Sequence, residues 1–219
     1  MRKLSIALAA AVSIGAQSAS AIDYLTAECE QVLAVSALPS QMRAGASIYV
    51  LQPSGFIKTV QGDGPFTCIV QRNHAKSLIP QCVDRRGAEV LIPAMIHKTN
   101  MYLSGATAAE VRADFDARTE SGEFVAPDNI GVNYMMSHYN YIYLRGPGRV
   151  ERVPPHLMHY APNITNEDVR AVEGAAQKSM PHINDQGIHG YYISFVEGPS
   201  DFSDVQRSCA GQVGDFPPS

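Results

Sequence analysis

The first 21 residues have the pattern of an export signal, which constrains the fold because it sets the redox environment of everything that follows. Arg2 and Lys3 precede the apolar stretch 4–16, and residues 19–21 (Ala-Ser-Ala) match the small-x-small pattern of a signal-peptidase site. The apolar stretch is too short to span a bilayer as a stable helix. We therefore predict a cleaved signal peptide over 1–21 and a mature protein over 22–219. Because the signal is short and alanine-rich, we expect this protein in the bacterial periplasm or in the medium.

All the cysteines of the chain lie downstream of this signal, at Cys29, Cys68, Cys82 and Cys209. An even number of cysteines in an oxidising compartment predicts disulfides, and three pairings are possible. We favour Cys68–Cys82, which are close in sequence, together with Cys29–Cys209, which would join the two ends of the chain. The alternative is a catalytic thiol at Cys68 with a histidine partner. The second cysteine nearby and the oxidising location disfavour it.

Charge and hydropathy exclude several classes of partner. The formal net charge is −4 and no basic cluster is present, which argues against nucleic acid and anionic membrane surfaces. No second stretch of about 18 uncharged apolar residues occurs, so we expect no membrane insertion. The apolar fraction of 45% is typical of a globular chain, and a mature chain of this length predicts one domain, with a loose tail at 216–219.

The periodicity of apolar residues changes along the chain from helical to alternating. It predicts a helix over 22–38 and a three-stranded antiparallel meander over 48–51, 56–60 and 66–70. A capping box formed by Thr107 and Glu110 begins a helix over 108–120. The remaining predicted elements are strands at 90–92, 132–136, 139–144, 149–153 and 190–196, and a short helix over 165–172. Because strands and helices do not alternate regularly, we predict an α+β fold: a single domain with a largely antiparallel sheet and a few flanking helices.

Motifs of the common enzyme classes are absent from the sequence. It contains no Gly-x-Ser-x-Gly, no His-Glu-x-x-His, no phosphate-binding glycine-rich loop that ends in Lys-Ser or Lys-Thr, and no Cys-x-x-Cys. These absences disfavour most well-known hydrolases, kinases, nucleotide-binding proteins and redox proteins.

The densest unusual segment is 154–162, Pro-Pro-His-Leu-Met-His-Tyr-Ala-Pro. If its centre forms one helical turn, His156 and His159 share a face and could ligate a transition metal, whose bound water would be a hydrolytic nucleophile. Further ligands for such a site could come from His138, His189 and Asp185. We favour the simpler interpretation, in which His156 is buried and hydrogen-bonded, locking this segment to the sheet, and His159 is exposed.

Methionine stands beside or near histidine three times, at 136–138, 158–159 and 180–182. Thioether and imidazole ligands together suit copper, a metal that is handled outside the cytosol. Methionine also fills irregular space in protein cores, and three such pairs can arise by coincidence. We favour coincidence.

Tyr139, Tyr141 and Tyr143 alternate along a predicted strand and therefore point to one face. If exposed, they would form a platform on which a sugar or a peptide could bind. The alternative, which we favour, is a tyrosine face packed beneath a helix, since tyrosine is common in antiparallel strands.

Several segments spread over most of the mature chain form a set. They are 34–39 (AVSALP), 47–51 (SIYVL), 64–70 (GPFTCIV), 80–84 (PQCVD), 131–137 (GVNYMMS), 155–158 (PHLM) and 160–162 (YAP). The set resembles a family of exported bacterial proteins that has no known activity. The resemblance implies export and a single domain, and it assigns no ligand, cofactor or catalytic residue.

The sequence therefore favours a non-catalytic binding or envelope-associated protein, whose partner would be a small molecule or an envelope component. The alternative is a metal-dependent hydrolase or a metal-binding protein centred on His156 and His159. These classes differ in their geometry. The first needs the tyrosine face in solvent, whereas the second needs His156 and His159 to converge in a cleft.

Overall fold

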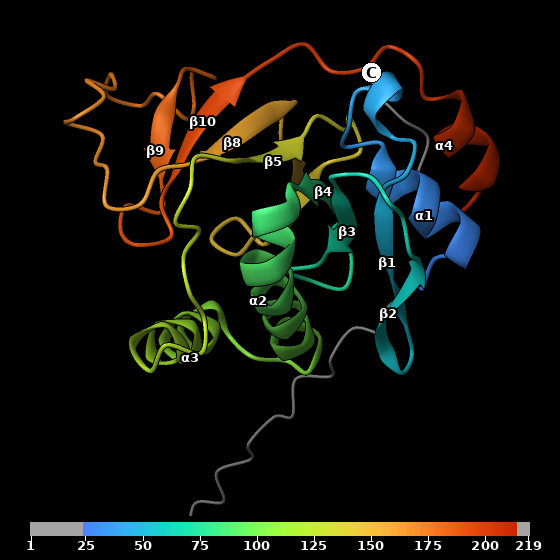
Figure 1. Cartoon of the computed structure of the whole chain (residues 1–219), viewed down its shortest axis with the longest axis horizontal. Coiled ribbons are helices and arrows are strands. Elements are labelled where there is room, and N and C mark those ends of the chain that lie inside the picture. Colours follow the sequence, from blue (N-terminus) through green and yellow to red (C-terminus); the bar gives the residue numbers. More distant parts are fainter. Residues whose placement is uncertain (1–23, 214–219) are drawn as a thin grey trace, which may run out of the picture.

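One large sheet organises residues 24–213, the part of the chain that the computed structural model describes (Figure 1). Its strands are β1 (Ser47–Gln52), β2 (Gly55–Val60), β3 (Thr67–Gln71), β4 (Ile79–Val83), β5 (Val132–Met135), β8 (His156–Tyr160), β9 (His182–Asn184) and β10 (Tyr191–Phe195). Across the sheet their order is β2-β1-β3-β4-β5-β8-β10-β9, and of these strands only β1 and β3 pair in parallel. The predicted signal peptide (1–21) and loose tail (216–219) lie outside the described residues.

Helices cover both faces of this sheet, as Figure 1 shows. On one face lies α1 (Ala27–Val35), against which α4 (Ser203–Ser208) packs; on the other lies α2 (Arg85–Leu103), with α3 (Ala108–Glu120) beside it. A 3-10 turn (Ser40–Met42) follows α1, and the hairpin of β6 (Tyr141–Leu144) and β7 (Arg149–Arg152) forms a small second sheet. The prediction of an α+β fold with a largely antiparallel sheet is confirmed.

Alternation along the strands divides the apolar core into two layers. Val50 and Cys68 belong to the layer under α1, whereas Ile69 and Val83 belong to the layer under α2. We call the side of the sheet that packs against α2 the α2 face. Each layer is closed by a helix in the centre of the sheet, but β8, β9 and β10 extend beyond α2 (Figure 1).

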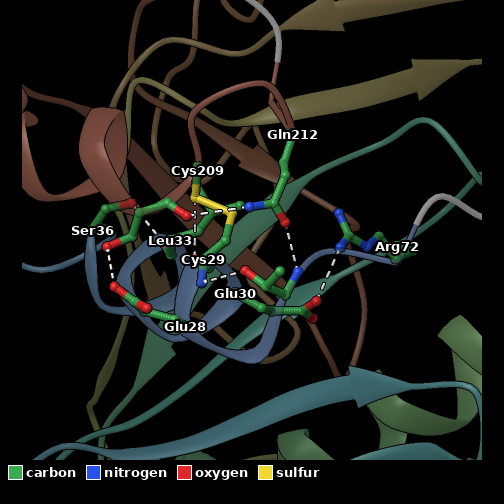
Figure 2. Close-up of a disulfide and its surroundings, with 10 residues drawn as sticks. Glu28, Cys29, Glu30, Leu33, Ser36, Arg72, Cys209 and Gln212 are labelled. Carbon is green, nitrogen blue, oxygen red and sulfur yellow. Dashed lines mark hydrogen bonds and ion pairs between the residues drawn. A yellow bond between two sulfur atoms is a disulfide. The ribbon is translucent and has the colours of Figure 1, made fainter.

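Both predicted disulfides are present. Cys68 and Cys82 are direct partners on β3 and β4, with their Cα atoms 4.1 Å apart. Cys29 on α1 is joined to Cys209, the residue that follows α4, across a sequence separation of 180 (Figure 2). Two disulfides are typical of proteins that fold in an oxidising compartment.

A buried ion pair lies next to the second of these disulfides (Figure 2). Glu30 on α1 and Arg72, just after β3, are 0% and 2% exposed, and Glu30 Oε2 lies 3.4 Å from Arg72 Nη2. The other carboxylate oxygen accepts the backbone N–H of Leu51 at 3.0 Å, and Arg72 Nη1 donates to Ser77 O at 2.8 Å. Burial raises the pKa of Glu30, while Arg72 and the Leu51 N–H act in the opposite direction.

The predicted three-stranded meander is wrong in its third strand. β1 and β2 form the expected hairpin, but the chain then crosses β1 and adds β3 on the other side, parallel to β1. The crossing passes directly over the backbone that enters β1, and Gly64 N donates to Gly45 O at 2.8 Å. A Cβ at Gly62 would lie 1.9 Å from Gly45 O, so only a residue without a side chain can make this approach.

Replacing Gly62 with alanine is expected to lower the free energy of unfolding by about 1–3 kcal/mol, because backbone atoms must move to admit the methyl group. Gly146→Ala is the matched control, since nothing lies within 4 Å of a Cβ there; we expect a change within about 0.5 kcal/mol. Urea unfolding followed by circular dichroism measures both. Equal stability of Gly62→Ala and the wild type would contradict the tight crossing.

Three further local predictions differ from the structure. Residues 90–92 lie inside α2, where all three are buried, and exposed Pro93 does not end the helix. Residues 165–172 form turns, because Arg170 adopts a left-handed conformation (φ 50°), although Thr165 and Asp168 make the expected capping hydrogen bonds. The segment around His156 is strand β8, not a helical turn.

Candidate functional site

The α2 face of the sheet carries a cavity of about 600 Å³ beside the end of α2, lined by residues of β4, β5, β8, β9 and β10. Its floor is formed by strand side chains, its walls by the end of α2 and the β6–β7 hairpin. The apolar residues that line it are Ile79, Met135, Ile142, Leu144, Val153, Pro154, Met158, Ala176, Ile193 and Phe195. A cavity of this volume, mostly apolar with a few polar groups, is typical of small-molecule sites.

The polar lining of the cavity is cationic or neutral. Lys98 and Arg152 line it together with two histidines and several amide side chains, and no aspartate or glutamate of the described residues does so. The amide residues are Gln71, Asn73, Gln81, Asn140, Gln177 and Asn184. This lining contrasts with the formal net charge of −4 of the whole chain. The cavity is therefore suited to a neutral or anionic group and unsuited to a cation.

His156 and His182 present equivalent imidazole groups to the cavity. His156 Nδ1 lies 2.7 Å from Pro154 O, and His182 Nδ1 lies 2.9 Å from Met180 O. Because a carbonyl oxygen only accepts, Nδ1 carries a hydrogen in both rings, and Nε2 of the neutral His156 ring is left as an acceptor. Burial lowers the pKa of His156, so its ring is neutral at physiological pH. Both rings pack against Phe195, at centroid distances of 5.9 and 6.1 Å.

Lys98 is the most perturbed basic group of the site. Its Nζ lies 3.5 Å from the centroid of the Phe115 ring on α3, and in residues 24–213 it makes no hydrogen bond or ion pair. Burial lowers the pKa of Lys98 to about 8. A strongly perturbed lysine in a cavity marks a candidate functional residue.

Arg112 explains why Lys98 lacks a carboxylate partner. Asp116 and Asp185 are the carboxylates whose charge acts on Lys98. Arg112 binds both, with its Nε 2.9 Å from Asp116 Oδ1 and its Nη1 2.7 Å from Asp185 Oδ1. Their charge is largely neutralised there, and Lys98 is left facing an aromatic ring.

The structure does not bring the predicted metal ligands together. Because β8 is a strand, His156 and His159 point to opposite faces of the sheet, and His159 lies beside Tyr192. His138 packs against Phe202, with ring centroids 4.7 Å apart, near α4. Within residues 24–213 no group of three or more His, Cys, Asp or Glu side chains could hold a metal ion. His156 itself is buried and hydrogen-bonded, as we favoured, while His159 is half-buried.

The remaining predicted ligands are also dispersed. His189 and Asp185 lie near Lys98, where they line a second, smaller cavity. Of the three methionine–histidine pairs, Met158 and His182 line the cavity, whereas His159 faces away from it and His138 packs against Phe202. They provide no common copper site in the described residues.

The three tyrosines do not form a common exposed face. Tyr139 is 2% exposed and precedes β6. Tyr141 and Tyr143 are half-buried within β6, where burial raises the pKa of Tyr141 to about 12. The ring of Tyr143 stacks on His74 at a centroid distance of 3.9 Å. These tyrosines hold the hairpin beside the cavity instead of forming a platform.

Sequence reasoning missed Lys98 because it missed the helix that carries it. Leu91, Met95, Lys98 and Tyr102 follow one another at spacings of four, three and four, which places them on one side of α2. A lysine that continues an apolar helical stripe is the signal that could have identified this residue.

Comparison with protein-family models, with curated proteins and with solved structures finds no match to the chain. No helix within residues 24–213 is long and apolar enough to cross a membrane. The site is therefore the evidence that bears on function.

Proposed function

We propose that the protein binds a small, largely apolar molecule in the main cavity, and that the polar end of this ligand is a hydrogen-bond acceptor, best a carboxylate. The observation that carries the proposal is the lining of the cavity, which among residues 24–213 consists of an apolar floor with the basic residues Lys98 and Arg152 and without a carboxylate. Burying the apolar part of a ligand supplies most of the affinity, while the few polar groups select its head.

Asn140 supports a ligand with a polar end. It lines the cavity and is 0% exposed, and neither its Oδ1 nor its Nδ2 has a hydrogen-bond partner in the described structure. An unpaired buried amide costs about 1–3 kcal/mol. A ligand whose polar atoms hydrogen-bond to the Asn140 amide would remove this cost.

The test is a series of octyl compounds that differ only in their head group. Isothermal titration calorimetry with octanoate, octan-1-ol and octylammonium at neutral pH compares an anion, a neutral group and a cation on the same apolar chain. We expect octanoate to bind most tightly and octylammonium most weakly. Absence of binding by all three, or preference for the cation, would contradict the proposal.

Lys98→Met is expected to weaken octanoate binding about tenfold or more, since a hydrogen bond to a charged group contributes about 1.5–3 kcal/mol. Octan-1-ol binding should change little. Lys58→Met is the matched control, because Lys58 also lies over an aromatic ring, that of Tyr49, but at the opposite edge of the sheet. It should leave both affinities unchanged.

Octanoate affinity is also expected to fall as the pH rises through about 8, where Lys98 loses its proton. The ammonium attracts the carboxylate and the neutral amine does not, so the contribution of Lys98 is present below this pH and is lost above it. Titrations at pH 7 and pH 9 measure the change, with octan-1-ol as the pH-independent control. A pH dependence that persists in Lys98→Met would assign it to another group.

We further propose that binding occurs outside the cytosol, in the periplasm or the medium, as a member of the exported bacterial family that the sequence resembles. The two disulfides support an oxidising location. In the proposed function the protein binds this ligand and does not catalyse a reaction on it. In this proposal the neutral ring of His156 acts as a polar group of the lining.

A further inference from the structure

Lys98 separates the main cavity from a second, smaller one. It lines both, and the second cavity, of about 120 Å³, lies towards Phe115 and His189. Lys98 therefore stands at the junction between a space large enough for an apolar ligand and a small chamber lined by both polar and apolar residues.

Desolvation of Nζ favours the neutral amine and outweighs the face of the Phe115 ring, which lies 3.5 Å away and favours the ammonium. The titratable and charged groups that face it are Arg112 and Asp116 from α3, and Asp185 and His189 from the segment before β10. Arg112 holds both carboxylates, so neither forms an ion pair with Lys98. With a pKa of about 8, roughly a quarter of Lys98 is uncharged at pH 7.5, against about 0.1% of a lysine at the ordinary value of 10.5.

His189 provides an unpaired acceptor in the same chamber. Its Nε2 lies 3.2 Å from Thr119 Oγ1, and this hydroxyl donates its own hydrogen to Phe115 O at 2.8 Å. Nε2 must therefore donate, which leaves the hydrogen off Nδ1. Nδ1 is buried without a hydrogen-bond partner in the described structure, and the His189 ring lies 4.7 Å from that of Phe115.

From this geometry we infer that Lys98 is a nucleophilic amine, which forms an imine with an aldehyde held in the main cavity. A desolvated lysine beside a ligand cavity is the arrangement that activates an amine towards carbonyl compounds. The inference rests on the proposed function to the extent that the cavity must admit the apolar part of the aldehyde.

The reaction balances without a further reagent. The lone pair of neutral Nζ attacks the carbonyl carbon, a C–N bond forms, and the C=O π electrons move to oxygen. A proton passes from nitrogen to that oxygen, and His189 Nδ1 is the acceptor available to carry it. The hydroxyl of the carbinolamine then leaves with one proton as water, and the C=N bond forms.

Octanal with sodium cyanoborohydride tests the inference on the intact, oxidised protein, because reduction converts the imine into a stable secondary amine. Peptide mapping by mass spectrometry separates an octyl group on Lys98 from one on the α-amino group or on the exposed lysines Lys58, Lys76 and Lys178. We expect Lys98 to be labelled at least tenfold faster than these three lysines at pH 7.5. Its labelling rate should rise with pH to a midpoint near 8.

Two variants distinguish reactivity from access. Arg112→Gln should slow the labelling of Lys98 at pH 7.5 and move its midpoint upward, because Asp116 and Asp185 are then free to stabilise the ammonium. Lys98→Met should remove the adduct while octan-1-ol still binds. Labelling of lysines in proportion to their exposure, with octan-1-ol bound normally, would overturn the imine and leave the binding proposal intact. Failure of both octanal and octan-1-ol would overturn both.

Discussion

Replacing Cys29 and Cys209 together with alanine is expected to lower the free energy of unfolding by about 5 kcal/mol. The pair is 180 residues apart, so the cross-link removes a large part of the chain entropy of the unfolded state. Alanine is the suitable replacement because both positions are buried (0% and 1% exposed), where a hydroxyl would lack a partner. Urea unfolding without reductant, followed by circular dichroism, measures the loss.

The second disulfide supplies the matched comparison. Cys68 and Cys82 are only 14 residues apart, and the same entropy argument gives about 3 kcal/mol for their joint replacement. A larger loss for this pair than for Cys29–Cys209 would show that loop length does not govern the stabilisation.

Loss of Cys29–Cys209 should also have a local effect. Only a few polar contacts accompany it between the two ends of the described chain, among them Ser208 Oγ to Glu28 Oε1 at 2.8 Å and Thr26 N to Gln212 Oε1 at 2.7 Å. We therefore expect faster hydrogen exchange of α4 amides in the double alanine variant, with exchange in α2 changed only by the global loss of stability.

Arg72→Met is expected to destabilise the protein by about 3–5 kcal/mol, because it leaves the carboxylate of Glu30 buried without its counter-ion. Glu30→Gln combined with Arg72→Met should recover a substantial part of this loss, since no buried charge then remains. Arg86→Met is the control: its ion pairs with Glu89 and Asp128 are exposed and are worth about 0–1 kcal/mol. Urea midpoints of the four proteins measure these differences.

The pH dependence of Arg72→Met gives an independent check. Without Arg72, the pKa of buried Glu30 rises further above its unfolded value, so the folded state binds the proton more tightly than the unfolded state does. The variant should thus lose stability as the pH rises from about 4.5 through the folded pKa of Glu30, more steeply than the wild type. The same slope in both proteins would mean that Arg72 does not stabilise the ionised carboxylate.

Local patterns in the sequence predicted several elements correctly. The capping box of Thr107 and Glu110 gives a helix over Ala108–Glu120, the range that was expected. The hairpins β1–β2 and β6–β7 were recognisable because alternating residues flank turn residues. Both disulfide pairings were also predicted. These features depend on residues close in sequence, or on few possible pairings.

The errors arose where distant contacts outweigh local preference. Val90 and Ile92 have high strand propensity, but both are buried against the α2 face, and Asp84 caps the helix that contains them. Pro80 obscured β4, which is buried along its whole length between β3 and β5. These errors also hid the candidate site. Because α2 was not predicted, there was no reason to place Lys98 beside a cavity.

By itself the sequence determined the redox setting expected of the chain, its α+β class, its cysteine pairs, and the burial and hydrogen bonding of His156. The first three follow from composition, from short-range periodicity or from the small number of possible cysteine pairings, and the hydrogen bond of His156 is to a residue two positions away. Only the tertiary structure decided that β3 lies on the far side of β1 from β2, and that His156 and His159 point to opposite faces of the sheet. It also decided that Lys98 contacts Phe115 while Arg112 binds the nearby carboxylates. These juxtapositions depend on strand order and helix packing. Both are set by the summed burial of residues far apart in the chain, and no local pattern encodes that sum.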